Sequence, residues 1–189
     1  ELNEKRIRSF RTWWLGQAVQ PSRSIQEKLV VFWHNHFATN TSIADDKIKA
    51  RFWYNHYLTL RQHALGNFKN MVKAVTLDPA MLYFLNGESN VKGSPNENFA
   101  RELQELYTVG KGPNSKYSED DVKAAALVLT GHTVSPTAFT YFFDAGKHDS
   151  TNKEFSSFYS NKIITGYSGA NGVNEVDDLM DMIFGQEEL

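Results

Sequence analysis

Apolar residues recur every three or four positions along the first two thirds of the chain, which is the spacing of one face of an α-helix. The pattern covers residues 3–19, 24–37, 45–65, 67–77, 79–85, 95–109 and 118–129. Because these segments are separated by short breaks, they must pack against one another to bury their apolar faces. The sequence therefore predicts a mainly α-helical fold with orthogonal or bundle-like packing.

Three helix starts carry specific signals. Ser94 precedes Pro95 and stands three residues before Glu97, which is a capping box with proline at the first helical position. Ser118 is followed by three acids, which suit the positive end of a helix dipole. Ser24 is a further N-cap candidate. We expect helices to begin at these three serines.

The helical pattern stops after Gly131 and returns only near the end of the sequence, in NEVDDLMDMIF. Between these points, the segments TAFTYFF and KIITG favour short strands, and their surroundings are rich in Gly, Ser and Asn. We therefore expect a small β or irregular insert near residues 138–166, within a single domain covering residues 1–189.

The composition excludes several classes of function. With 20 basic and 22 acidic residues the formal charge is −2, so no overall positive field attracts nucleic acid. No cysteine is present, which excludes disulfides and thiolate metal sites. The longest apolar run, residues 124–129, is too short to span a bilayer. The basic cluster Lys5, Arg6, Arg8 and Arg11 is typical of a solvated helix face.

The segment FWHNHFATN contains His34 and His36, which raises the question of a metal site or a nuclease motif. At about 100° per residue, Ile25 and Phe32 fall on one line with His36, while His34 lies roughly opposite. Two histidines spaced by two on a helix cannot share an ion, and a His-Asn-His nuclease needs a hairpin before its helix. We therefore expect His36 to face the core, either as an ordinary buried histidine or with a polar partner. His56 and other histidines are weaker candidates.

The segment 95–109 offers that partner. Glu102 falls inside its apolar half, between Leu106 and Val109, and Asn98 and Glu105 lie at the margin. A carboxylate on a core face must be neutral, paired with a cation or bound to metal. We expect His36 to meet Glu102, as a buried His–Glu pair or as a divalent-metal site with nitrogen and oxygen ligands.

The opposite side of the same segment has a simpler interpretation. Arg101 is four residues from both Glu97 and Glu105, so an exposed ladder of ion pairs is expected there, with Gln104 also facing away from the core. His148 and Asp149 follow in a loop, where polar residues often meet solvent or ligand.

Five segments occur in an order that resembles the bacterial domain-of-unknown-function family 1800: EKLVVFWHNHFAT, LRQHALGNFKNMVKAVTLDPAMLYFLNG, NENFARELQELYTVG, YSEDDVKAAALVLTGHTV and FFDAGKHDSTNK. The similarity spans about residues 20–155. Members of this family are usually longer, commonly exported, and often encoded beside a protein that resembles the alkaline phosphatase or sulfatase superfamily. The resemblance implies a mostly helical fold, a longer parent protein, an extracytoplasmic (periplasmic or secreted) setting and a partner of that kind. It brings no established activity.

The family motifs mark three sets of residues: residues 34–36, residues 96–105, and the pair His148 and Asp149. The candidate catalytic residues are His36, Asn98, Arg101 and Glu102. The candidate ligands of a divalent metal ion are His34, His36, Glu102, Glu105, His148 and Asp149.

Two functions fit these residues. The first is an exported, hydrolase-like or other enzyme, in which a metal ion or the His–Glu pair supplies the chemistry. The second is a non-catalytic helical module that binds a protein or a glycan at the cell exterior. Its binding platform would be aromatic, formed by Trp13, Trp14, Tyr54, Tyr57, Tyr141 and Tyr159.

Overall fold

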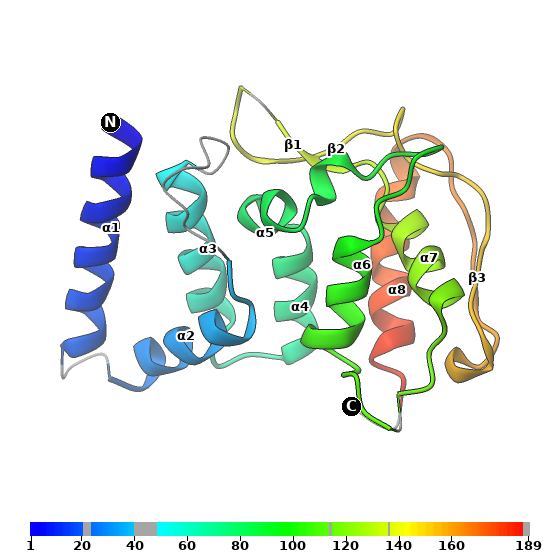
Figure 1. Ribbon diagram of the computed structural model, residues 1–189, viewed down its shortest axis with the longest axis horizontal. Helices are drawn as coiled ribbons and strands as arrows, with labels where there is room; N and C mark the ends of the chain where they lie inside the picture. The colour runs from blue at the N-terminus through cyan, green and yellow to red at the C-terminus, as the bar shows by residue number, and fades with distance from the viewer. Residues whose placement is uncertain (21–23, 40–48, 114, 136, 187–189) are drawn as a thin grey trace. The chain divides into compact units, whose positions relative to one another are not determined.

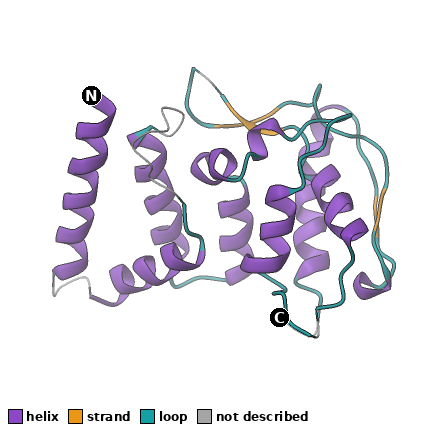
Figure 2. Cartoon of the chain, in the orientation of Figure 1, coloured by secondary structure: helices purple, strands orange, loops and turns teal. Residues whose placement is uncertain are grey.

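The computed structural model describes residues 1–20, 24–39, 49–113, 115–135 and 137–186 (Figure 1). The chain divides into two compact units, Glu1–Phe84 and Leu85–Leu189, each of which is described by itself. Helices dominate and the strands are short (Figure 2), which confirms the mainly α-helical fold with a small β insert. The single-domain organisation stays a prediction.

The unit Glu1–Phe84 is organised around one helix, α3. Its described elements are α1 (Leu2–Val19), α2 (Ser24–His36), α3 (Ala50–His63), α4 (Phe68–Thr76) and α5 (Pro79–Phe84). Helix α3 packs against each of the other four, and α2 also contacts α1 (Figure 1). The buried side chains of α3 are Phe52, Trp53, His56, Tyr57 and Leu60. The part of the predicted helix at residues 45–48 lies outside the described residues.

Helix α2 turns a different face inward from the one its sequence suggests. Ile25 and Phe32 are 64% and 58% exposed, whereas Glu27, Val30 and Phe37 are completely buried. The prediction of a buried line through Ile25 and Phe32 is therefore wrong. Residues 29–33 are all apolar, so the spacing alone does not select one face of this helix.

A buried carboxylate accounts for the orientation of α2. Glu27 accepts hydrogen bonds from the Tyr57 hydroxyl (2.9 Å) and from Arg61 Nε (2.8 Å), both on α3. Burial, with the hydrogen bond to Glu27 next, raises the pKa of Tyr57 to about 12, so this hydroxyl keeps its proton and donates. A buried carboxylate is stable only with such partners, so this trio fixes how α2 lies on α3.

The unit Leu85–Leu189 combines helices with two small β-ribbons. Its α-helices and strands are α6 (Asn98–Glu102), α7 (Glu119–Val128), α8 (Glu175–Ile183), β1 (His132–Val134), β2 (Tyr141–Phe143), β3 (Lys153–Glu154) and β4 (Ile163–Ile164). Helix α7 packs against α6, α8 and β3, which makes it the centre of this unit (Figure 1).

Both ribbons are antiparallel. Strand β1 pairs with β2, with His132 opposite Phe143, and β3 pairs with β4, with Lys153 opposite Ile164. The strand tendencies of TAFTYFF and KIITG are confirmed in β2 and β4. Strand β1 was missed, because HTV directly follows a helix and is too short to show alternation.

The predicted capping box at Ser94 is wrong. Helix α6 begins at Asn98, and Ser94 instead closes a turn by bridging to Val91. The Asn98 amide donates to Asn96 Oδ1 at 3.0 Å, so Asn96 satisfies one of the free amides at the start of the helix. Asn96 therefore does the work that the sequence pattern assigned to Ser94.

The segment after α6 explains a second error. Leu103–Tyr107 is a π-helical turn, which holds more residues per turn than an α-helix and so rotates the following side chains. Gln104 is 0% exposed and Leu106 is 61% exposed, the reverse of the prediction. Gln104 is buried with a partner, since its Oε1 accepts from the Tyr159 hydroxyl at 2.8 Å.

The helix start at Ser118 is confirmed. Ser118 Oγ accepts from the Asp121 amide, and the Ser118 amide donates to Asp121 Oδ2, which completes a capping box. Asp121 also accepts from the amide and the hydroxyl of Ser156, both at 2.7 Å. Burial alone would raise the pKa of Asp121, but these hydrogen bonds outweigh burial and hold its pKa below the usual value. Asp121 therefore ties the first turn of α7 to the loop after β3.

We expect Asp121→Ala to lower the free energy of unfolding by about 2–4 kcal/mol, because it removes a cap and leaves the donors of Ser118 and Ser156 without an acceptor. Urea unfolding followed by circular dichroism measures the change. The matched control is Asp120→Ala, since Asp120 is 87% exposed and bonds only to Lys123 among the contacts seen. Equal losses of unfolding free energy in the two variants would contradict the role of Asp121 in holding α7 to the loop after β3.

Candidate functional site

The most buried polar cluster lies in the unit Leu85–Leu189 and joins His148, Lys153 and Glu175. His148 Nε2 lies 2.9 Å from Glu175 Oε1, and Lys153 Nζ donates to Glu175 Oε2 at 2.5 Å. The Tyr167 amide donates to Glu175 Oε1 at 2.7 Å, and His148 Nδ1 lies 2.8 Å from the Thr130 carbonyl oxygen. Both nitrogens of the imidazole and both oxygens of the carboxylate are therefore occupied.

This cluster is closed to solvent. The side chains of His148, Lys153 and Glu175 are exposed by no more than 1%. Burial alone would raise the pKa of Glu175, but the hydrogen bonds from His148, Lys153 and the Tyr167 amide outweigh it and hold the pKa below its usual value. An ionised glutamate in this place stabilises the junction of β3, α8 and the loop after β2.

Asp149, the neighbour of His148, belongs to the local turn. Its Oδ1 accepts from the amide and the hydroxyl of Thr151, and its carbonyl oxygen accepts from Lys153 Nζ. Burial opposes ionisation of Asp149, but the bonds from Thr151 prevail and lower its pKa. Of the predicted pair in this loop, His148 therefore enters the buried cluster and Asp149 shapes the turn beside it.

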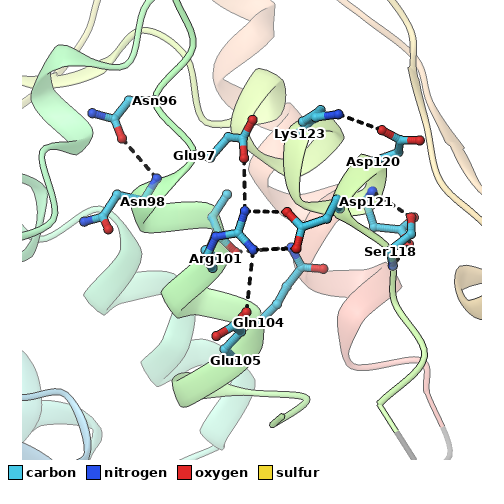
Figure 3. A network of polar contacts seen from close by, with 12 residues as sticks. Asn96, Glu97, Asn98, Arg101, Gln104, Glu105, Ser118, Asp120, Asp121 and Lys123 are labelled. Atoms are coloured by element: carbon cyan, nitrogen blue, oxygen red, sulfur yellow. Dashed lines mark hydrogen bonds and ion pairs between the residues drawn. The ribbon is translucent and has the colours of Figure 1, made fainter.

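Arg101 is held by three carboxylates (Figure 3). Its guanidinium makes two hydrogen bonds to Glu119, at 2.6 and 2.9 Å, and ion pairs with Glu97 at 3.1 Å and Glu105 at 3.6 Å. The predicted ion pairs with Glu97 and Glu105 are confirmed, although these side chains are half-buried rather than exposed, and Glu119 at the start of α7 joins them. The hydrogen bonds to Glu119 raise the pKa of Arg101 and lower that of Glu119. Because acids surround it, this arginine is poorly suited to attract an anionic substrate, and its catalytic role stays a prediction.

Asn98 makes hydrogen bonds that fix the backbone around the start of α6. Its Nδ2 donates to the Leu85 carbonyl oxygen at 3.1 Å, and its own amide is capped by Asn96 (Figure 3). The neighbouring Asn90 accepts from the Asn96 amide and donates to the Ala126 carbonyl oxygen. These asparagines connect the start of α6 to the segments around it.

His36 and Glu102 are both half-buried, and the predicted pair takes one residue from each unit. His36 lies beside the rings of Trp33, Phe37 and Phe68. The carboxylate of Glu102 adds to burial in raising the pKa of Tyr107 to about 12. The pairing of His36 with Glu102 stays a prediction.

His34 lies beside the rings of two tryptophans and a second histidine within its unit. Its ring centroid lies 4.8 Å from that of Trp14, 5.8 Å from that of Trp53 and 6.0 Å from that of His56. Burial, with the proximity of His56, lowers the pKa of His34 to about 4, so the ring is neutral at pH 7. We call Trp14, His34, Trp53 and His56 the ring cluster.

A third histidine site involves His132. Its Nδ1 lies 2.8 Å from the Tyr141 hydroxyl, across the β1–β2 ribbon. Burial, together with nearby His148, lowers the pKa of His132 to about 3. The ring of His132 is therefore neutral at pH 7.

The predicted metal ligands do not converge within either unit. Across the described residues, no group of three or more His, Asp or Glu side chains is placed to hold a metal ion. A divalent ion therefore stays a prediction. The described helices also contain none that is long and apolar enough to cross a membrane, in agreement with the sequence.

The predicted aromatic platform is only partly at the surface. Trp13 and Tyr54 are exposed, with ring centroids 5.9 Å apart, and they form one small patch. Tyr57 and Tyr159 are buried, so the prediction that they belong to a surface platform is wrong. Each buried tyrosine has a polar partner, which the aromatic pattern in the sequence does not reveal.

Sequence reasoning missed Glu175, Glu119 and the ring cluster as a group. Glu175 follows the Gly- and Asn-rich residues 166–174 and precedes the buried Val176, so its neighbours give only a weak signal for a buried carboxylate. The partners in the ring cluster come from three separate helices, and no local spacing connects them.

A family model described as "Protein of unknown function (DUF1800)" matches residues 1–189, the whole chain. No curated protein matches the chain, and no solved structure matches it.

We expect Glu175→Gln to lower the free energy of unfolding by about 3–5 kcal/mol, because the charge of Lys153 would stay buried without its carboxylate. Thermal and urea unfolding measure the loss. Glu154→Gln is the control, since Glu154 is the exposed neighbour of Lys153. A loss no larger than that of the control would contradict a structural role for the cluster.

The stabilisation that Glu175 provides should depend on pH. The pKa of Glu175 is lowered by folding, so its contribution is present above the ordinary glutamate pKa and is lost as the pH falls through the lowered value. The difference in stability between the native protein and Glu175→Gln should therefore be largest near neutral pH and shrink in acid. A difference that grows on acidification would contradict an ionised Glu175.

Proposed function

The chain belongs to the DUF1800 family of proteins of unknown function, and we propose that it is a binding module that docks an acidic amphipathic helix of a partner protein. The docking surface is an apolar groove between α1 and α2 in the unit Glu1–Phe84. The extracytoplasmic setting expected from the family resemblance remains part of the proposal.

The groove is the observation that carries the proposal. It has a volume of about 310 Å³ and is lined by Arg11, Trp14, Leu15, Ala18 and Val31. The α1 residues of this set are spaced three or four apart, so they form one continuous stripe along the helix. We call this surface the α1–α2 groove.

Apolar side chains extend beyond the lining. Leu15 is 68% exposed and Val31 is 40% exposed, and Val19 and Phe32 nearby on the same two helices are also exposed. Contiguous exposed apolar surface on a folded protein marks an interaction site more often than chance exposure does. Because the lining offers almost no hydrogen-bonding groups, it suits apolar protein side chains better than a glycan.

Charge at the edge of the groove favours an acidic partner. Arg11 lines the groove, Arg8 lies one turn before it on α1, and exposed Lys28 lies one turn before Val31 on α2. Arg8 also pairs with Glu4 at 2.6 Å, an exposed contact that a partner carboxylate can replace at small cost. Basic groups beside an apolar stripe match an amphipathic helix with acids along its edges.

The enzyme hypothesis has weaker support. The cluster of His148, Lys153 and Glu175 is closed to solvent and fully bonded within its unit, and Arg101 is neutralised by carboxylates. A catalytic group must reach the atom on which it acts. The open, apolar surface of α1 and α2 supports binding more directly than these clusters support catalysis.

We expect a fluorescein-labelled acidic amphipathic helix to bind the purified chain, measured by fluorescence anisotropy, and Leu15→Asp and Val31→Asp each to weaken binding at least about tenfold. A basic helix with the same apolar face tests the charge argument and should bind more weakly. Leu106→Asp is the matched control, because Leu106 is as exposed as Leu15 but lies in the other unit.

Equal binding of both peptides, or equal loss in all three variants, would contradict the proposal. Analytical ultracentrifugation tests the competing occupant, a second copy of the chain. If the chain forms a dimer that Leu15→Asp dissociates, the occupant of the groove is a second copy of the chain and not a partner protein.

A further inference from the structure

The ring cluster of Trp14, His34, Trp53 and His56 contains buried polar atoms without protein partners. Trp14 Nε1, Trp53 Nε1, His34 Nε2 and both ring nitrogens of His56 are buried, and none has a hydrogen-bond partner among the described residues. Asp78 Oδ1 lies 3.4 Å from His56 Nδ1, close enough for attraction but without hydrogen-bond geometry. His56 itself is 1% exposed.

We propose that the ring cluster binds the carboxylate group of a small monocarboxylate ligand with an apolar tail. The four rings come from α1, α2 and α3 and meet around His34, whose ring contacts each of the other three. This proposal goes beyond partner docking and does not require it, since its site lies among the rings rather than on the exposed stripe.

The chemistry of the nitrogens selects the ligand. An indole N–H only donates, so the indole groups of Trp14 and Trp53 can bond only to an acceptor atom of a ligand. A neutral imidazole adds one donor, and His34 is neutral because burial and His56 lower its pKa to about 4. A carboxylate has two oxygens with about four acceptor positions, which matches the several unpartnered nitrogens of the ring cluster.

Two other ligand classes fit less well. A metal ion would use only the histidines and would leave both indole groups of Trp14 and Trp53 unsatisfied. A phosphate carries more negative charge into a site where the carboxylate of Asp78 already lies beside His56. A single carboxylate with an apolar tail suits a site walled by aromatic rings.

Trp14 also gives the ligand a route. The same residue lines the α1–α2 groove and contacts His34, so the ring cluster lies directly behind one wall of that groove. Displacement of the Trp14 side chain would open the cluster to a ligand that enters from the groove.

The test follows the indole N–H signals of the ¹⁵N-labelled chain by NMR during titration with sodium phenylacetate at constant pH and ionic strength. We expect saturable shifts of the Trp14 and Trp53 signals. Trp33 is the internal control, because its Nε1 already donates to the Ala64 carbonyl oxygen at 3.1 Å. Sodium chloride and inorganic phosphate are titrated in parallel, and neither should reproduce the shifts.

Trp53→Phe removes one donor and should weaken phenylacetate binding roughly tenfold, whereas Trp33→Phe should leave it unchanged. If Trp53→Phe fails to fold, His34→Gln, at a half-buried position, replaces it with the same expectation. Absence of saturable shifts, identical shifts with chloride, or equal weakening by the Trp33 and Trp53 variants would overturn the site. Binding of phosphate more tightly than phenylacetate would overturn the assignment of a carboxylate ligand.

The Leu15→Asp variant separates this site from the proposed docking surface. It should lose binding of the partner helix and retain binding of phenylacetate.

Discussion

Each unit depends on a buried carboxylate whose partners come from elsewhere in the same unit. In the unit Glu1–Phe84, Glu27 joins α2 to α3 through Tyr57 and Arg61. In the unit Leu85–Leu189, Glu175 joins α8 to β3 and to the loop before it. An ionised group in a core is tolerated only when its hydrogen bonds are complete, so each carboxylate permits one arrangement of the segments around it.

Completeness of hydrogen bonding also separates structural clusters from candidate binding sites. Around Glu175 both imidazole nitrogens, both carboxylate oxygens and the Lys153 ammonium are bonded, which leaves little to offer a ligand. The ring cluster around His34 is the opposite case, because several buried nitrogens have no acceptor among the described residues. Buried polar groups in native proteins are nearly always bonded, so an incomplete set points to recognition. Both clusters contain histidine, and they differ in which polar atoms remain available for a ligand.

Helical spacing and helix-start signals predicted most of the helices, since both depend on residues that are close in sequence. The same signals failed for the α2 face, because residues 29–33 are all apolar, and for Gln104, because a π-helical turn shifts the register. They also failed for Ser94, where Asn96 caps the helix instead. The candidate site was harder still. His148 was selected, but its partner Glu175 lies 27 residues away, and local spacing carries no information on such pairs.

The weakest element of the first unit lies where binding is proposed. Among the residues of α1, only Ile7 and Phe10 are buried, although the helix has 18 residues. Its other attachments include ring contacts, such as those of Trp13 and Trp14 with Tyr57, and a hydrogen bond from the Ala50 amide to Asn3 Oδ1. Few buried contacts mean a low free energy of local opening. Because Trp14 covers His34, small movements of α1 would expose the unpartnered nitrogens, and a ligand or partner that fills the groove would hold α1 in place. Binding and the stability of α1 are therefore expected to be coupled.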